Sequence, residues 1–329
     1  MIQVIQKFSQ LSLAPLLLFL TFLISSCMKE PEDPHGNQAK IDDEILQNYI
    51  ATNQIQANKT SYGYYYYPIQ ENEGGKEVAN GDIISFYYKM NLMDGTEVAS
   101  HTPAQGAPIK AKHFSESIFP IGLDLGLHHM KEGEIYKFLL PSSLAYYQYT
   151  DNAILPKYAN LILEIELINV SKADEQKAEE VALIQEYIQN NQLEGVTVLS
   201  SGLAYQVLEA GSGSKPTAMQ KVSVSYVGKL WDGTIFDQTT NGDLFSFNLG
   251  RQEVIRGWDQ GVALMQKSEK ARFYIPSYLA YDESVRIVPE SLKVGLIESG
   301  AVGGFKASVA KSIPPFSILV FDVTLEEIF

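Results

Sequence analysis

Two adjacent histidines, His128 and His129, are the first residues whose types suggest chemistry. They end the stretch "PIGLDLGLHHM", which runs from Pro120 to Met130. Neighbouring imidazoles can ligate a metal ion or transfer protons near neutral pH. The other histidines show no ligand spacing with this pair, so the sequence predicts no metal site. They are His35, His101 and His113.

The first 26 residues are typical of a secretory signal segment. Its apolar run, "LSLAPLLLFLTFLI", is shorter than the about 20 residues that span a bilayer. Ser25 and Ser26 then precede Cys27, the single cysteine of the chain. This order resembles a bacterial lipobox, in which Cys27 becomes the lipidated first residue. The alternative is an ordinary signal that happens to contain a cysteine.

The lipobox interpretation predicts a membrane-anchored, extracytoplasmic lipoprotein, on the periplasmic side of the outer membrane or at the cell surface. Residues 27–41 are polar and contain prolines, and they read as a flexible tether. The formal net charge of −14 argues against nucleic acid as a partner and against electrostatic docking to anionic lipid. Attachment to the membrane would therefore come from acyl chains on Cys27.

The chain repeats itself. Helical patterns occupy 42–58 and 171–193, and "LQNYIATNQI" in one superposes on "IQEYIQNNQL" in the other. "DIISFYYKMNLMDGTEV" matches "QKVSVSYVGKLWDGTIF", and both show the alternation of a half-buried strand before an Asp-Gly turn. "GLDLGLHHM" matches "GWDQGVALM", and "LPSSLAY" matches "IPSYLAY". We therefore divide the chain into a first domain, 59–170, and a second domain, 194–329.

The two repeats differ most at 282–312, where the second domain carries a long insertion rich in Gly, Ser and Ala. Its turn signals predict an elaborated loop. Such a loop could restrict access to a neighbouring site, act as a lid, or bind a partner. The helices 42–58 and 171–193 could be domain caps, an interdomain spacer or a dimer seam.

The second domain resembles the FKBP-type peptidyl-prolyl cis-trans isomerases, which bind macrolides. The blocks that carry the resemblance are "VSVSYVGKLWDGTIFD", "FSFNLGRQEVIRGWDQGVALM", "IPSYLAY" and "IPPFSILVFDVTLEEI". The resemblance implies an α+β fold with two FKBP-like domains. Each would be a curved antiparallel sheet wrapped around a short helix, 255–264 in the second domain, with a further helix before each domain.

The resemblance also implies a proline pocket floored by Trp258, with a buried carboxylate, Asp237, beside it. Tyr281 and the Ile255 N–H would donate hydrogen bonds to substrate carbonyls, and Ile313 would close one edge. It implies no cofactor, and proline-containing polypeptides or macrolide inhibitors as ligands. The remaining pocket residues are Tyr226, Phe236, Phe245, Phe247, Val254 and Phe321.

These residue types suit amide rotation. Rotation about an X-Pro bond has a barrier of about 18–20 kcal/mol, because the planar amide is stabilised by resonance. It needs no nucleophile, metal or net proton transfer, only tighter binding of the twisted amide than of the planar forms. An apolar aromatic pocket with a few oriented donors meets that requirement.

The first domain has lost parts of this pocket. Leu123 replaces Trp258, Val98-Ala99 replaces Phe236-Asp237, and Pro120, which has no N–H, replaces Ile255. We expect a folded but catalytically weak domain that is structural or holds unfolded protein. His128 and His129 fall at the end of its short helix, where a charged imidazole would favour the helix dipole. The tyrosine run "YGYYYYP", 62–68, could grip a partner or pack on its own sheet.

The leading hypothesis is a lipid-anchored prolyl isomerase that assists folding of extracytoplasmic proteins, with catalysis in the second domain. A non-catalytic FKBP-fold chaperone or scaffold is the alternative. A cell-surface adhesion or accessory protein is a third hypothesis, disfavoured by the joint presence of Trp258 and Tyr281.

Overall fold

The structure, a computed structural model, describes residues 34–113, 117–151, 153–240, 242–281 and 284–329. The predicted signal segment, Cys27 and the start of the tether lie outside these residues. None of the helices in the described part of the chain combines the length and the apolar character needed to cross a bilayer.

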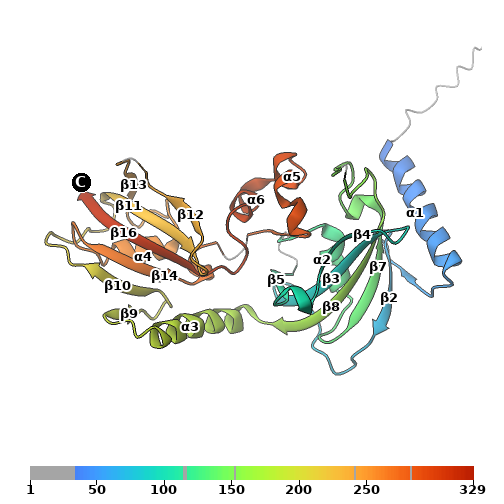
Figure 1. Cartoon of the computed structure of the whole chain (residues 1–329), viewed down its shortest axis with the longest axis horizontal. Helices are drawn as coiled ribbons and strands as arrows, with labels where there is room; N and C mark the ends of the chain where they lie inside the picture. The colour runs from blue at the N-terminus through green and yellow to red at the C-terminus, as the bar shows by residue number, and fades with distance from the viewer. Residues whose placement is uncertain (1–33, 114–116, 152, 241, 282–283) are drawn as a thin grey trace, which may run out of the picture.

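The first domain is built on a sheet whose strands are all antiparallel, with the order β1-β2-β7-β8-β3-β4 and with β5 paired to β3. Figure 1 shows this sheet strongly curved. Its strands are β1 (Asn58–Lys59), β2 (Tyr65–Gln70), β3 (Ile83–Leu92), β4 (Glu97–His101), β5 (Ile109–Lys112), β7 (Ile135–Leu140) and β8 (Leu161–Ser171).

The second domain repeats this sheet strand for strand, in the order β12-β11-β16-β14-β10-β9 with β13 paired to β11. The tandem α+β fold predicted from the sequence is therefore confirmed. The strands are β9 (Val196–Val198), β10 (Ala204–Glu209), β11 (Lys221–Leu230), β12 (Ile235–Gln238), β13 (Phe245–Asn248), β14 (Lys270–Ile275) and β16 (Leu319–Ile328).

Alternation along the strands builds each core. On β16, Leu319, Phe321, Val323 and Leu325 are buried and the residues between them are partly exposed. Side chains two apart share one face of a strand, so this series covers the concave face of the sheet. Val222 and Val224, on the neighbouring β11, are fully buried in the same core.

A short helix lies against each concave face: α2 (Ile121–Leu127) in the first domain and α4 (Arg256–Val262) in the second. The helix α4 is shorter at both ends than the predicted helix 255–264. It approaches β14 through Gly257 and Gly261, where a Cβ atom would lie 2.5 Å from Ile275 and 2.8 Å from Phe273. Two glycines one turn apart thus bring the helix backbone onto the sheet.

The helices that precede the domains, α1 (Pro34–Thr52) and α3 (Ala173–Asn190), each insert one buried carboxylate. Asp42 of α1 accepts hydrogen bonds from the Ser142 backbone N–H (3.0 Å) and hydroxyl (2.6 Å). Glu180 of α3 does the same for the Ser277 N–H (2.7 Å) and hydroxyl (2.8 Å). Both helices therefore act as domain caps, and α3 also joins the two sheets (Figure 1).

The serines that these carboxylates bind begin equivalent 3-10 turns, η2 (Ser142–Leu144) and η3 (Ser277–Leu279). The helix α1 begins within the segment predicted as a tether and ends before residue 58, so the predicted boundaries 27–41 and 42–58 are wrong there. An apolar cluster fixes α1 on its sheet, because Leu46 is fully buried against Leu139.

The described part of the insertion, 284–312, contains regular secondary structure, whereas the sequence predicted an elaborated loop over 282–312. It holds β15 (Arg286–Ile287), a 3-10 turn η4 (Glu290–Leu292), α5 (Lys293–Glu298) and α6 (Gly304–Ala310). Figure 1 shows α5 and α6 between the two sheets. The strand β15 pairs in parallel with β6 (Ile118–Phe119) of the first domain. The segment is rich in Gly and Ala, but it also carries apolar residues at the spacing of short helices. These residues are buried against the first domain, and this burial explains why the segment folds.

Glu180→Ala should destabilise the second domain by about 2–3 kcal/mol, because two buried donors of Ser277 lose their charged acceptor. Thermal and urea unfolding of the full chain would measure the loss. Glu186→Ala, on the exposed face of the same helix, should change stability by less than about 0.5 kcal/mol. Equal losses in the two variants would contradict a capping role for Glu180.

Candidate active site

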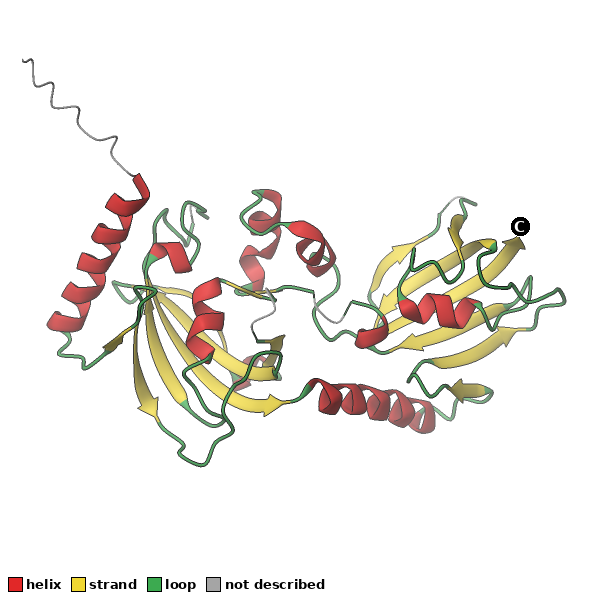
Figure 2. Ribbon diagram, turned by 180° about the vertical axis from the view of Figure 1, so that it is seen from behind, coloured by secondary structure: helices red, strands yellow, loops and turns green. Residues whose placement is uncertain are grey.

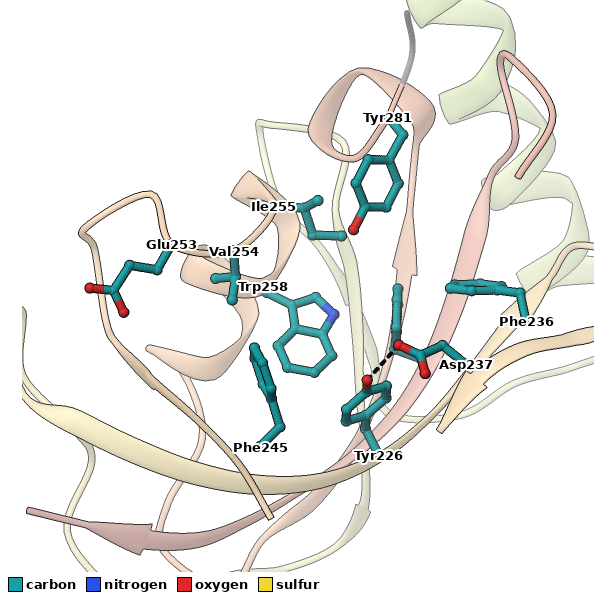
Figure 3. Close-up of a pocket in the computed structure, with 10 residues that line it drawn as sticks. Tyr226, Phe236, Asp237, Phe245, Glu253, Val254, Ile255, Trp258 and Tyr281 are labelled. Atoms are coloured by element: carbon teal, nitrogen blue, oxygen red, sulfur yellow. Dashed lines mark hydrogen bonds between the residues drawn. The ribbon is translucent and has the colours of Figure 1, made fainter. Parts of the chain in front are cut away.

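A cavity of about 180 Å³ opens on the concave face of the second sheet, beside α4 (Figure 3). Residues from β11, β12, β13, β16, the start of α4 and the end of η3 meet there. Apart from Glu253, every lining residue was predicted from the sequence. The lining comprises Tyr226, Phe236, Asp237, Phe245, Glu253, Val254, Ile255, Trp258, Tyr281 and Phe321.

Trp258 forms the floor of this cavity and is only 4% exposed. The rings of Tyr226 and Phe321 stand edge-on to it, at centroid distances of 5.0 and 5.2 Å. Edge-to-face packing of this kind fixes the rings of an aromatic cluster relative to one another. Among the described residues the indole Nε1 has no hydrogen-bond partner. A buried N–H without an acceptor is unfavourable.

Asp237 and Tyr226 form one hydrogen-bonded pair at the rim. The Tyr226 hydroxyl donates to Asp237 Oδ2 over 2.5 Å, and the Gln238 N–H donates to Asp237 Oδ1 over 2.9 Å. Asp237 is exposed, so the predicted buried carboxylate is wrong: β12 is an edge strand, and the carboxylate remains in contact with water. Burial, followed by the hydrogen bond to Asp237, raises the pKa of Tyr226 far above 10.

Tyr281 and Ile255, which both line the cavity, each carry a hydrogen-bond donor. Burial raises the pKa of the Tyr281 hydroxyl, and the charge of Asp237 adds to this, so Tyr281 stays protonated at neutral pH. Ile255 is the N-cap residue of α4, and its N–H therefore lies outside the helical hydrogen-bond pattern. Figure 3 shows the Tyr281 hydroxyl next to the Ile255 side chain. The turn η3, which Glu180 holds, places Tyr281 there.

A glycine at 228 is required by the pocket wall. A Cβ atom at this position would lie 2.7 Å from the Phe321 ring and 2.9 Å from the Phe236 ring. These two rings meet edge to face with centroids 5.5 Å apart. Gly228 on β11 thus leaves the space in which Phe236 turns towards Phe321.

Two predicted substrate-binding residues, Phe247 and Ile313, do not line the cavity. Phe247 is 3% exposed and lies in the core against Trp258, with ring centroids 5.9 Å apart. Ile313 is 7% exposed, and its carbonyl accepts a hydrogen bond from the Ser284 hydroxyl where the insertion begins and ends. Both residues belong to the core cluster that contains Trp258, so they pack in the core instead of lining the cavity.

Sequence reasoning missed Glu253. Its carboxylate accepts hydrogen bonds from the Asn248 N–H (2.8 Å) and side-chain amide (2.9 Å), and these bonds lower the pKa of Glu253. Figure 3 shows the carboxylate directed away from Trp258. Glu253 therefore closes the loop between β13 and α4. An acidic residue directly before a short helix was the available signal.

The equivalent positions of the first domain are closed. Tyr88, Val98, Leu123, Tyr146 and Leu163 are all less than 9% exposed. Among the described residues no group of three His, Cys, Asp or Glu side chains could hold a metal ion.

Of the two adjacent histidines, His128 is exposed and His129 takes part in the packing of the first domain. His129 Nε2 shares a hydrogen bond of 2.7 Å with the Tyr64 hydroxyl, and its ring stacks on Tyr66 at 4.3 Å. Burial lowers the pKa of His129, which disfavours the charged form that an interaction with the helix dipole would need. Tyr64 and Tyr65 are themselves buried, so this tyrosine run packs mainly on its own domain.

Asp237→Asn should lower the pKa of Tyr226, because the variant keeps an acceptor but removes the negative charge that opposes ionisation. The raised pKa favours the folded state below about pH 10 and loses this contribution at higher pH. Nuclear magnetic resonance of [13Cζ]tyrosine-labelled protein would follow the titration. Asp232→Asn, in the exposed turn of the same hairpin, should leave the Tyr226 pKa unchanged; a shift as large as that of Asp237→Asn would refute the pairing.

Comparison with known proteins adds to this geometry. The family model for FKBP-type peptidyl-prolyl cis-trans isomerase matches residues 74–168 and 212–326. The FKBP-type peptidyl-prolyl cis-trans isomerase FkpA of Aeromonas hydrophila is 32% identical over 239 residues, which cover 68% of this chain and 80% of that protein.

Two further matches are shorter. The outer membrane protein MIP of Legionella longbeachae is 38% identical over 111 residues, 33% of this chain and 46% of that protein. The crystal structure of FkpA from Escherichia coli matches with 36% identity over 47% of this chain and 62% of that chain, at a TM-score of 0.34. The two matched segments and the extended similarity to the Aeromonas protein show that this chain belongs to the FKBP-type peptidyl-prolyl cis-trans isomerases, in tandem form.

Proposed function

We propose that the second domain carries the isomerase activity and that it acts on proline-containing polypeptides outside the cytoplasm. Membership of the family establishes the reaction, cis-trans isomerisation of X-Pro bonds. The assignment to one domain, the roles of its residues and the compartment are the proposal. Macrolides, which occupy the same kind of pocket, are the expected inhibitors.

The observation that carries the proposal is the open cavity over Trp258, walled by aromatic rings and bordered by two donors. A twisted amide has lost resonance and much of its charge separation, so it leaves water at less cost than a planar amide. An apolar floor therefore favours the twisted form. Trp258 supplies that floor because its ring is fixed between Tyr226 and Phe321.

The donors stabilise the carbonyls that flank the rotating bond. The Tyr281 hydroxyl lies beside the Ile255 side chain, and the Ile255 N–H lies outside the hydrogen-bond pattern of α4, so both are candidate donors fixed before substrate enters. Tyr226 is already engaged with Asp237. We assign Tyr226 and Asp237 to holding the rim in place, and Tyr281, which lines the cavity beside Ile255, to contacting substrate.

In the described part of the first domain, the positions that correspond to the cavity lack two of its features. Leu123 stands where Trp258 lies, and it is fully buried. Pro120, which corresponds to Ile255, is the N-cap residue of α2 and has no N–H to donate. One aromatic floor and one main-chain donor are thus absent from its concave face, which favours catalysis by the second domain.

Anchoring through a lipid on Cys27 is the second part of the proposal. Residue 27 lies outside the described residues, so the support comes from the signal-like run and the small residues before it. A relative named as an outer membrane protein agrees with a membrane-associated location. The acidic surface implied by the charge of −14 makes acyl chains the expected means of attachment.

Trp258→Ala should reduce kcat/KM of the full chain for a proline tetrapeptide at least tenfold, because the floor of the pocket is removed. Tyr281→Phe should reduce it about five- to tenfold, the loss of one hydrogen bond in the transition state. A protease-coupled isomerisation assay would measure both.

Each variant has a matched control in the second domain. Trp231 packs outside the cavity against Tyr187, and Trp231→Ala should leave turnover nearly unchanged in folded protein. Tyr278 lies in the same turn as Tyr281 but donates to the Ser201 carbonyl, so Tyr278→Phe should also retain turnover. Full activity in Trp258→Ala would contradict catalysis at this pocket. No acceleration by the wild type would favour the non-catalytic chaperone or scaffold.

Cys27→Ala should abolish incorporation of labelled palmitate in cells and release the protein from the membrane fraction. The wild type should carry the label, because the cysteine would be its lipidated first residue. Ser26 provides a control position: Ser26→Ala keeps a small residue before Cys27 and should keep the label. Equal labelling of wild type and Cys27→Ala would exclude a lipid at this residue.

A further inference from the structure

The concave face of the first domain is occupied by part of the same chain. The insertion leaves the second domain after Tyr281 and returns near Ile313, and between these points it packs into the first domain (Figure 1). Its apolar side chains belong to the core cluster that contains Tyr88, Leu123 and Tyr146. These insertion residues are Val285, Ile287, Val288, Leu292, Leu296, Val302, Ala307 and Ala310.

The backbone of the insertion runs along one particular edge of the first domain. The Arg286 N–H donates to the Ser117 carbonyl over 2.6 Å, and the Val288 N–H donates to the Phe119 carbonyl over 2.9 Å. The Arg286 guanidinium also donates to the Lys110 carbonyl over 3.0 Å. Phe119 corresponds to Val254, which lines the cavity of the second domain. The strand β15 therefore lies, in the first domain, at the position that corresponds to the rim of the cavity in the second domain.

The decisive contact involves the carbonyl that precedes a proline. The Tyr146 hydroxyl donates to the Val288 carbonyl, and residue 289 is a buried proline. Tyr146 is the counterpart of Tyr281, the residue assigned to a substrate carbonyl in the second domain. Tyr146 is 4% exposed whereas Tyr281 is only partly buried, because Val288-Pro289 covers the former.

The segment continues across the pocket. Tyr88, the counterpart of Tyr226, has its pKa raised to about 12 by burial and then by the nearby charge of Glu290. The segment that pairs with Phe119 through Ile287 therefore brings Glu290 near enough to Tyr88 to affect its ionisation. The replacements Trp to Leu123, Phe to Val98 and Phe to Leu163 all reduce side-chain volume, which makes room for an occupant of this size.

We propose that the first domain is a binding site for an X-Pro peptide segment and that its resident ligand is Ile287-Val288-Pro289 of the same chain. The occupied site ties the insertion of the second domain to the first domain. This inference rests on the family's affinity for X-Pro segments and not on turnover by the second domain.

The test uses the full chain and a fluorescein-labelled peptide, SVRIVPESL, the sequence of residues 284–292. A tethered segment has an effective concentration in the millimolar range, so micromolar peptide should not displace it from the wild type. Val288→Asp puts a carboxylate at a fully buried position and should release the insertion. Fluorescence anisotropy should then show binding at least tenfold tighter than to the wild type.

A second change locates the bound peptide. Adding Tyr146→Phe to Val288→Asp should weaken peptide binding about fivefold, the contribution of one hydrogen bond. Adding Tyr87→Phe removes a hydroxyl that donates to the Gly106 carbonyl outside this site, and it should leave binding unchanged. Equal affinity with and without the Tyr146 hydroxyl would place the peptide elsewhere and overturn the proposal.

Limited trypsin digestion reports release independently of the peptide. The Val288→Asp variant should be cut within 286–311 much faster than the wild type, because its insertion is released. If this variant is cut faster but does not bind the peptide, the proposal is overturned. If Val288→Asp does not fold, Tyr146→Phe alone should speed the same cleavage several-fold, with Tyr87→Phe as the control. If Tyr146→Phe were cleaved at the wild-type rate, the proposal would be overturned. Neither readout measures isomerisation, so a failure here leaves the catalytic assignment unaffected.

Discussion

Each concave sheet face is covered by a helix much shorter than the strands that it lies against. The helices α2 and α4 have seven residues each, and at about 1.5 Å per residue they extend for about 10 Å. The strand β16 has ten residues, and at about 3.3 Å per residue it extends for about 33 Å. Most of the concave face must therefore be covered by side chains or by another segment, and the two domains meet this requirement differently.

The second domain meets it with aromatic rings. Trp258, Tyr226 and Phe321 stand edge to face and leave a cavity rather than a closed core. The first domain has leucine and valine at several of these positions, and its concave face is closed by Val288 and Pro289 from the insertion. The smaller side chains of the first domain leave space on its concave face, and the apolar residues of the insertion fill that space.

The helices that precede the domains, α1 and α3, cap one end of each sheet. Asp42 and Glu180 stand at matching places in α1 and α3, and each binds the serine that begins a 3-10 turn. In the second domain this turn leads into Tyr281, so a residue of the interdomain helix helps to position the donor. The exposed side chains on these helices, such as Ile45 and Leu183, lie on the outer faces, and the buried contacts are those of caps.

The predictions from sequence were most accurate for features that depend on neighbouring residues or that occur in both repeats. Alternation along β3 and β11, the Asp-Gly turns and the matching blocks were sufficient to predict two similar curved sheets. The aromatic pocket followed from the resemblance, and its members except Phe247 and Ile313 line the cavity. The exposure of Asp237 was missed because burial depends on which strand is at the edge of a sheet. Glu180 was missed because its partner, Ser277, is distant in the sequence.

The sequence by itself determined that this protein has two FKBP-like domains and that only the second keeps the aromatic floor, since residue identity at aligned positions is enough to establish both. Only the tertiary structure decided where the insertion packs. Its Gly- and Ala-rich composition predicted a loop, because local propensity contains no information about a surface on another domain. The contact between Tyr146 and Val288 joins residues far apart in the chain, and such a contact exists only once both sheets are folded.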